Sequence, residues 1–234
     1  MRNARGSLPM YLQIAELLVR DIAAGRLIDG EKLAPEREMA VELGIAVGTL
    51  RKTLAELQSR GLLERVQGSG NYIRAISDPK SVYAMFRLEL IGGGGLPTAE
   101  VLDVHRLEKP EHFPVFGASN EGHRIRRLRR LSGKVVAVEE IWLDGSYVEA
   151  VTADELSESL YLYYRTRLGL WIARAEDQIG LGVVPGWAPD AFGQKPGTLV
   201  PHVLRLSQAQ DGVTAELSHT WYDHTMARYV SRLR

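Results

Sequence analysis

The chain of 234 residues contains no cysteine. This absence excludes a disulfide framework, a thiol nucleophile and a zinc site with cysteine ligands. The sequence also has no apolar run near the ~20 residues that cross a bilayer as a helix. Its first residues, MRNARGSLPMYLQ, lack the apolar stretch of a secretory signal. We therefore expect a cytoplasmic protein without a membrane partner.

An excess of either charge is also missing, because 29 basic residues balance 29 acidic ones. A protein that coats DNA without regard to sequence neutralises many phosphates, so a net charge of zero argues against that class. The charge is nevertheless uneven: residues 51–74 hold five arginines or lysines against two glutamates. A solvated helix face explains this local excess as well as a nucleic-acid partner does.

Three helices are predicted within the first 61 residues. The first follows Pro9 and has one apolar stripe, whose members recur at spacings of three and four: Tyr11, Ile14, Ala15, Leu18 and Ile22. The second begins at Pro35 and ends at Gly44. The third runs from about Val47 to Gly61. Two short helices joined by a tight glycine turn predict a helix-turn-helix.

The third helix presents small and basic side chains on its outward side near the N-terminus. Gly48, Thr49 and Lys52 lie on that side, and Arg51 lies at its flank. In a helix-turn-helix the second helix enters the major groove with its N-terminus first. Arg51 is the best candidate for a bidentate contact with a guanine edge.

The segment LLERVQGSGNYIRA predicts a β-hairpin, with strands at 62–67 and 71–75. Gly68 and Gly70 have no Cβ, so the backbone at the tip can approach a sugar-phosphate ridge closely. A turn that only reverses the chain is the simpler interpretation of the same residues. Because a recognition helix directly precedes the hairpin, we interpret it as a wing that contacts DNA.

Residues 8–75 resemble the winged-helix domain of GntR-type bacterial transcription regulators, through YLQIAELLVRDIAAGRL and GEKLAPEREMAVELGIAVGTLRKTLAELQSRGLLERVQGSGNYI. The resemblance implies double-stranded operator DNA as a partner. It places these residues at the family's DNA contacts: Arg37, Thr49, Arg51, Gln67, Gly68 and Ser69. Pro35 stands where many members have a serine cap, and Val47 stands where many have an arginine. Contacts with bases should therefore depend more on Arg51 and Lys52.

The remainder of the chain predicts an α+β domain with a mainly antiparallel sheet. Strand-like runs occur at 99–107, 123–131, 134–143, 170–182, 199–208 and 213–223. Short helical pieces are predicted at 153–169 and 185–193. The expected organisation is a DNA-binding domain over residues 1–75, a linker over 76–83 and an effector and dimerisation domain over 84–234.

Arginines share a strand face with apolar residues in this half. Arg127 and Arg129 alternate with Ile125 on one face, and Glu139 lies on the matching face of the next strand. The opposite faces are apolar too, so the pattern leaves open which side is inside. An unpaired buried ion costs several kcal/mol, so arginines on an inner wall would bind an anionic ligand unless Glu139 satisfies them.

Two further groups are candidates for ligand contact. Glu216 and Tyr222 belong to a polar row on the last strand run. Ser159 heads the expected helix at SLYLYY, where N-capping alone accounts for it as well as ligand contact does.

This half resembles the UTRA effector domain of the HutC-like branch of GntR regulators, whose fold is related to chorismate lyase. The resemblance depends on RLRRLSGKVVAVEEIWL, SESLYLYYRTRLGL and TAELSHTWYDH. It implies a small-molecule effector that contacts a set of seven residues: Arg127, Arg129, Glu139, Ser159, Tyr161, Glu216 and Tyr222. Four glycines, Gly92–Gly95, replace a loop that helps to close over ligand in the family, so the shape of that loop is not predicted.

The resulting hypothesis is a homodimeric transcriptional repressor controlled by a small, anionic metabolite, without enzymatic activity, cofactor or metal. The alternative is a chorismate lyase-like enzyme fused to a DNA-binding domain. No nucleophile–base pair is evident in the sequence, and the six histidines are scattered. The ligand would alter the spacing of two winged helices through the linker.

Overall fold

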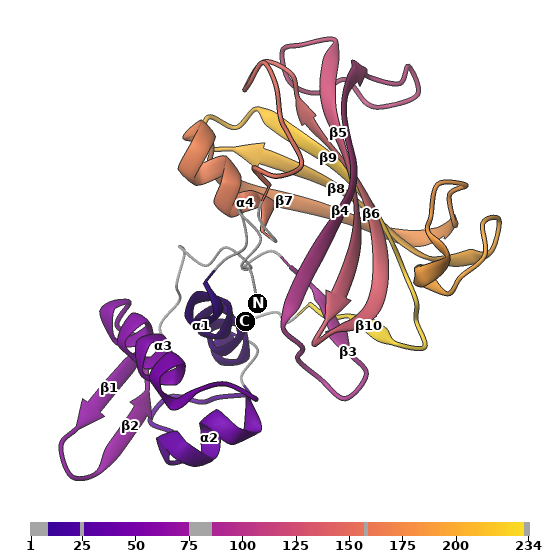
Figure 1. Cartoon of the computed structure of the whole chain (residues 1–234). Coiled ribbons are helices and arrows are strands. Elements are labelled where there is room, and N and C mark those ends of the chain that lie inside the picture. Colours follow the sequence, from indigo (N-terminus) through magenta and orange to yellow (C-terminus); the bar gives the residue numbers. More distant parts are fainter. Residues whose placement is uncertain (1–8, 24–25, 75–85, 157–158, 232–234) are drawn as a thin grey trace. The chain divides into compact units, whose positions relative to one another are not determined.

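The computed structural model describes residues 9–23, 26–74, 86–156 and 159–231 (Figure 1). The chain divides into two compact units, one formed mainly by residues up to 86 and the other mainly by residues 87–230. The predicted linker at 76–83 lies outside the described residues. No helix in the described part of the chain has the length and apolarity needed to span a membrane.

The first unit contains three helices and one hairpin, in the order α1 (Met10–Ala23), α2 (Glu36–Glu42), α3 (Val47–Ser59), β1 (Leu63–Val66) and β2 (Gly70–Ile73). The three predicted helices and the predicted hairpin are therefore present. Their boundaries differ from the expected ones by one or two residues.

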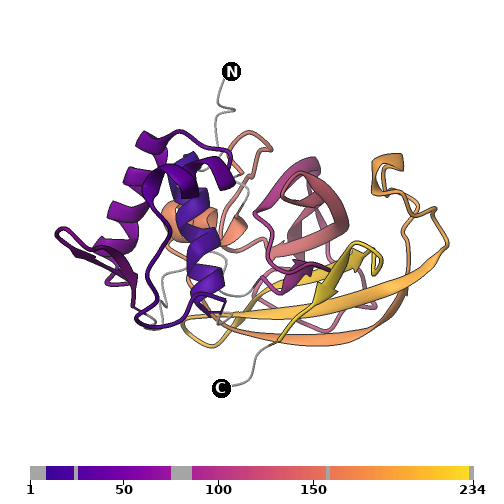
Figure 2. The same cartoon turned by 90° about the horizontal axis from the view of Figure 1, so that it is seen from below.

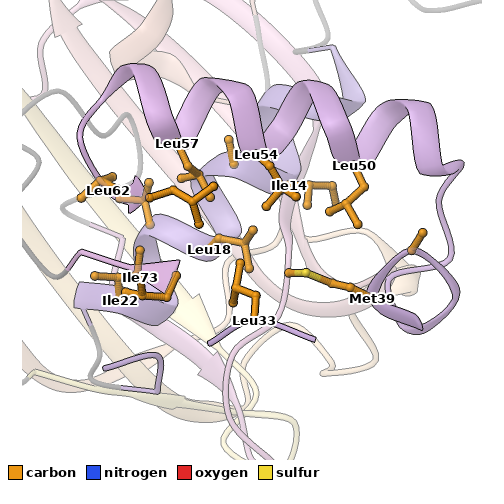
Figure 3. Close-up of a cluster of buried hydrophobic side chains, with 14 residues drawn as sticks. Ile14, Leu18, Ile22, Leu33, Met39, Leu50, Leu54, Leu57, Leu62 and Ile73 are labelled. Atoms are coloured by element: carbon orange, nitrogen blue, oxygen red, sulfur yellow. The ribbon is translucent and has the colours of Figure 1, made fainter. Parts of the chain in front are cut away.

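Figure 3 shows the core of this unit, where the apolar stripes of α1 and α3 face each other. Ile14 and Leu18 of α1 meet Leu50, Leu54 and Leu57 of α3, and each is at most 4% exposed. Burial of one such side chain contributes about 1.5–3 kcal/mol.

The ends of α2 also agree with the sequence. Pro35 occupies its N-cap position and makes no side-chain capping hydrogen bond. At the other end, Gly44 has a φ of +65°, a conformation that a residue with a side chain rarely adopts, so the chain turns sharply into α3.

The second unit is built on a six-stranded antiparallel sheet with the order β4-β5-β6-β9-β8-β7 (Figure 1). Its strands are β4 (Pro97–Glu108), β5 (Glu121–Leu131), β6 (Lys134–Asp144), β7 (Ile172–Val183), β8 (Leu199–Ala209) and β9 (Thr214–Tyr222). In Figure 2, β7 and β8 run side by side as long ribbons.

The predicted hairpin between β5 and β6 has a two-residue turn, because Leu131 pairs directly with Lys134. Ser132 and Gly133 have φ values of 48° and 80°. Positive φ at both central residues is the type I′ geometry, which matches the twist of the flanking strands.

Two short strands were not predicted from the sequence. β3 (Leu88–Leu90) and β10 (Ala227–Tyr229) form a separate antiparallel pair. The helical pieces are shorter than expected. The first is α4 (Leu160–Tyr163) with the π-helical turn η1 (Tyr164–Leu168), and the second is only the 3₁₀ turn η2 (Asp190–Phe192), directly after Pro189.

Strands β5, β6 and β9 have buried side chains on both faces of the sheet, which explains why alternation alone did not identify an inner side. On one face Leu128 and Val138 pack with Val184, Phe192 and Val200. The other face holds the predicted charged residues, which are also buried.

Candidate DNA-binding surface and effector site

The N-terminal turn of α3 presents the predicted contact residues to solvent. Gly48, Arg51 and Lys52 are exposed and Thr49 is half-buried, whereas Leu50 is fully buried against the core. Arg37 is exposed on α2. The apolar stripe of α3 therefore fixes the helix while its small and basic side chains remain available.

The hairpin of β1 and β2 has the open tip expected of a wing. Gln67, Gly68 and Ser69 are all exposed, and Gly68 has a φ of +75°. A Cβ at Gly68 would meet no atom within 4 Å, so the glycine is required by the backbone angle and not by crowding within the chain. The Ser69 hydroxyl lies 2.6 Å from the Tyr72 hydroxyl, which braces the tip.

A groove of about 610 Å³ separates the wing from the segment that leads into α2. Lys32 and Glu36 line one side, and Arg65, Gly68 and Ser69 line the other. The groove brings the wing, the start of α2 and their charged side chains onto one surface. We refer to this surface as the basic surface. It consists of Gly48, Thr49, Arg51 and Lys52 of α3, the wing tip Gln67, Gly68 and Ser69, and the residues that line the groove.

Glu36 is a residue of this surface that sequence reasoning missed. Its Oε2 accepts a hydrogen bond from Arg51 Nε at 2.7 Å, and its Oε1 lies 4.0 Å from Arg65 Nη2. The contact with Arg51 spans 15 residues, beyond the reach of helix periodicity, so no local pattern could have revealed it.

In the second unit, strand register places Arg127, Arg129 and Glu139 on one face of the sheet. Arg127 pairs with Glu139 across β5 and β6, and Arg129 pairs with Ala137 one step along. Arg127 Nη2 donates a hydrogen bond to Glu139 Oε2 at 2.8 Å, and Arg129 Nε lies 3.5 Å from Glu139 Oε1. All three side chains are below 10% exposed. We call them the arginine cluster.

The electrostatics of Glu139 follow from this geometry. Burial by itself raises the pKa of the Glu139 carboxyl, but the charges of Arg129 and Arg127 outweigh it, and the pKa falls below its ordinary value. Glu139 is thus held as a carboxylate. The arginine cluster therefore brings two guanidinium groups and one carboxylate into contact, all three of them buried.

A second group of polar residues joins α4 and η1 to the same sheet face. The Tyr161 hydroxyl lies 3.0 Å from Ser207 Oγ, and the Tyr164 hydroxyl donates to Glu216 Oε2 at 2.6 Å. Ser207 Oγ donates to Glu216 Oε1 at 3.0 Å. Burial raises the pKa of Glu216, despite the hydrogen bonds that oppose it.

The two remaining predicted residues, Ser159 and Tyr222, make contacts within the fold. Ser159 caps α4, since its Oγ accepts a hydrogen bond from Leu162 N at 3.3 Å. Tyr222 pairs with Ala137, beside the arginine cluster, and is 7% exposed. The capping role predicted for Ser159 is confirmed, and ligand contact at either residue stays a prediction.

Sequence reasoning also missed several members of this face. Arg205 Nε and Nη2 donate to the two oxygens of Asp177 at 2.5 and 2.6 Å, and Tyr229 of β10 donates to the same carboxylate. Register places Arg205 beside Ser218 and Ser207 beside Glu216. Alternation along β8 could have identified Arg205 and Ser207, because both share the face of the polar row on β9.

Among the residues that the structure describes, no three histidine, aspartate or glutamate side chains gather in an arrangement for a metal ion.

Comparison with known proteins assigns both halves. The family model for bacterial regulatory proteins of the gntR family matches residues 10–73, and the UTRA domain model matches residues 93–228. HTH-type transcriptional regulator SmoD of Agrobacterium fabrum is 76% identical over 234 residues, covering 100% of each chain. HTH-type transcriptional repressor NagR of Bacillus subtilis is 25% identical, covering 99% of this chain and 98% of its own.

Solved structures agree in fold. The possible transcriptional regulator YydK from Bacillus subtilis subsp. subtilis str. 168 matches with a TM-score of 0.55 and 20% identity, covering 97% of this chain and 100% of its own. These relatives are named as regulators, and the alternative of a chorismate lyase-like enzyme is not supported. The chain belongs to the GntR family of bacterial regulatory proteins and is a transcriptional regulator with a winged helix-turn-helix domain followed by a UTRA domain.

Proposed function

We propose that this regulator is a cytoplasmic, homodimeric repressor that leaves its operator when a small anionic metabolite binds in the UTRA domain. The observation that carries the proposal is the buried arginine cluster, Arg127–Glu139–Arg129, on a covered face of that domain. The name of the relative NagR, a repressor that aligns over almost its whole length, supports repression.

The chemistry of the cluster favours an anion. Two guanidinium groups share one carboxylate there, and a planar guanidinium binds carboxylate or phosphate groups in bidentate fashion. Tyr161, Glu216, Ser159 and Tyr222 would supply further polar contacts to the ligand.

On DNA, the N-terminus of α3 would enter the major groove. Arg51 would contact a guanine edge, and Gly48, Thr49 and Lys52 would lie against the groove wall. Arg37 would contact phosphate, and the wing would lie along the adjacent backbone through its tip residues Gln67, Gly68 and Ser69.

The homodimer would form through the free side of β7, the last strand in the sheet order. Ile179, Leu181 and Val183 alternate along one face of β7, Val183 pairs with Leu199 of β8, and each is more than half exposed. We call these four residues the β7 strip. Helix-turn-helix proteins bind two-fold operators as dimers, so a second copy of this chain is the expected occupant. An edge strand left apolar and uncovered otherwise promotes aggregation.

The effector proposal is tested by thermal and chemical unfolding with paired compounds, each sugar phosphate or acidic amino-acid derivative measured against its neutral parent. A true effector at a hundredfold excess over its dissociation constant stabilises the chain by about 2.7 kcal/mol. It also releases operator DNA, whereas its neutral parent does neither.

The matched variants are Arg127→Ala and Arg130→Ala. Arg130 lies on the same strand but is partly exposed, with its partner Glu100. Arg127→Ala should abolish the stabilisation by ligand, and Arg130→Ala should keep it. Arg129→Lys provides a second, charge-conserving variant in case loss of Arg127 impairs folding. Unchanged ligand affinity in folded Arg127→Ala and Arg129→Lys proteins would refute the site.

A further inference from the structure

Glu36 connects three elements of the basic surface through a single carboxylate. It is the first residue of α2, its Oε2 accepts from Arg51 of α3, and its Oε1 faces Arg65 of β1. The side chain of Glu36 is 27% exposed, while those of Arg51 and Arg65 are 67% and 41% exposed. An acidic residue at the centre of a surface that contacts DNA opposes binding to phosphate, so its presence requires a compensating role.

The atoms involved indicate that role. A guanidinium has five N–H groups, and Glu36 engages only the Nε–H of Arg51. The two terminal nitrogens of Arg51 remain available for O6 and N7 of one guanine, which is the geometry of bidentate contact. A flexible arginine without this contact would have to lose more rotamer freedom on binding a base.

The contribution of the Glu36–Arg51 ion pair to folding stability does not account for its presence. Exposed ion pairs contribute only about 0–1 kcal/mol to folding. The opposite oxygen of Glu36 lies 4.0 Å from Arg65 Nη2 of the wing, so one carboxylate faces both a side chain directed at bases and one that lies beside the backbone.

We propose that Glu36 is a positioning residue for base discrimination: it orients the guanidinium of Arg51 for bidentate contact with guanine and couples that orientation to Arg65 of the wing. The inference depends on the proposed DNA contact of Arg51. Glu36 therefore lowers the affinity for DNA of any sequence through its charge, and raises the preference for the operator through geometry. The effect on affinity and the effect on preference have opposite signs, so measurements on two DNA sequences can separate them.

Glu38 supplies a matched control. It is exposed, and like Glu36 it lies in the first turn of α2, so Glu36→Gln and Glu38→Gln remove the same charge from the same helix end. The dissociation constants of intact wild-type, Glu36→Gln, Glu38→Gln and Arg51→Ala proteins would be measured on two duplexes of equal length. One duplex is selected from a random library by the wild-type protein, and the other is its scrambled sequence.

Glu38→Gln should tighten binding to both duplexes equally and leave the preference unchanged. Glu36→Gln should reduce the preference for the selected duplex by about fivefold or more while binding to the scrambled duplex tightens. In the Arg51→Ala background, Glu36→Gln should cause no further loss of preference. Equal melting curves for Glu36→Gln and Glu38→Gln would exclude a folding defect.

The inference is overturned if Glu36→Gln keeps the wild-type preference, or loses it equally with and without Arg51. If Arg51→Ala itself keeps the preference, the proposed contact of Arg51 fails first. If Arg51→Ala loses the preference and Glu36→Gln does not, only the role of Glu36 fails.

Discussion

Buried and half-buried charged side chains on the sheet of the UTRA domain lie beside partners of opposite charge or beside hydroxyl groups. Arg205 forms two hydrogen bonds with Asp177, and Arg127 forms one with Glu139. Ions removed from water without such partners would cost several kcal/mol each. The pairing keeps these groups ionised, and burial alone would have opposed that.

Two histidines on the opposite sheet face behave differently. His202 Nε2 lies 2.9 Å from His219 Nδ1, and the His219 ring stacks on Trp221 with a centroid distance of 5.6 Å. Burial, together with the neighbouring His202, lowers the pKa of His219 to about 4. His219 is therefore neutral in the folded chain at neutral pH.

This pKa predicts a loss of stability in acid. The unfolded chain has the ordinary histidine pKa and binds more protons than the folded chain between pH about 6.5 and about 4. The free energy of unfolding should fall over this window by about 2 kcal/mol, after a discount for partial exposure. Below pH about 4, protonation of His219 causes no further change in the free energy of unfolding.

The measurement is urea unfolding at pH 7 and pH 4.5 for wild-type, His219→Gln and His224→Gln proteins. Other groups titrate in the same range, so the difference between the variants is what counts. His224 is exposed and serves as the control. A His219→Gln protein that loses as much stability in acid as wild-type would contradict the assignment.

Elements with strong local signals were predictable from the sequence, and those set by distant partners were not. The helices α1 and α3 have complete apolar stripes, and the β5–β6 hairpin has a two-residue turn with glycine. β3 and β10 are three residues each, and they pair across more than 130 residues of sequence. Such short strands carry no periodicity of their own.

Among the residues of the candidate sites too, those with a local sequence signal were predictable and those defined by distant partners were not. Arg51, Arg127 and Glu139 could be proposed as site residues because alternation or helical spacing isolates them from an apolar background. Glu36 and Asp177 were missed because their significance lies in contacts with Arg51 and Arg205, 15 and 28 residues away. Strand irregularity adds a second limit: the register of β5 against β6 shifts between Arg129 and Arg130, which simple alternation does not anticipate.

The β7 strip is a feature that a single chain does not explain. Large apolar side chains at consecutive outward positions of an edge strand favour association. A two-fold pair of chains would bury them and would present two winged helices to one operator.

Leu181→Asp should therefore convert the protein to a monomer, because a charge in the middle of an apolar interface costs several kcal/mol. Light scattering at micromolar concentration should report 26.0 kDa, the mass of one chain, against twice this mass for wild-type. Val115→Asp is the control, since Val115 is fully exposed in a loop away from β7. A monomeric wild-type protein, or a Leu181→Asp dimer, would contradict the interface.

We propose that α3 and the wing of each chain bind one half of a two-fold operator. The most direct test is selection from a random library of duplex DNA by the intact protein, followed by sequencing. We expect two inverted half-sites with centres about one helical turn, ~34 Å, apart, each containing a guanine that Arg51→Ala no longer selects. A library without enrichment, or an unchanged motif with Arg51→Ala, would contradict it.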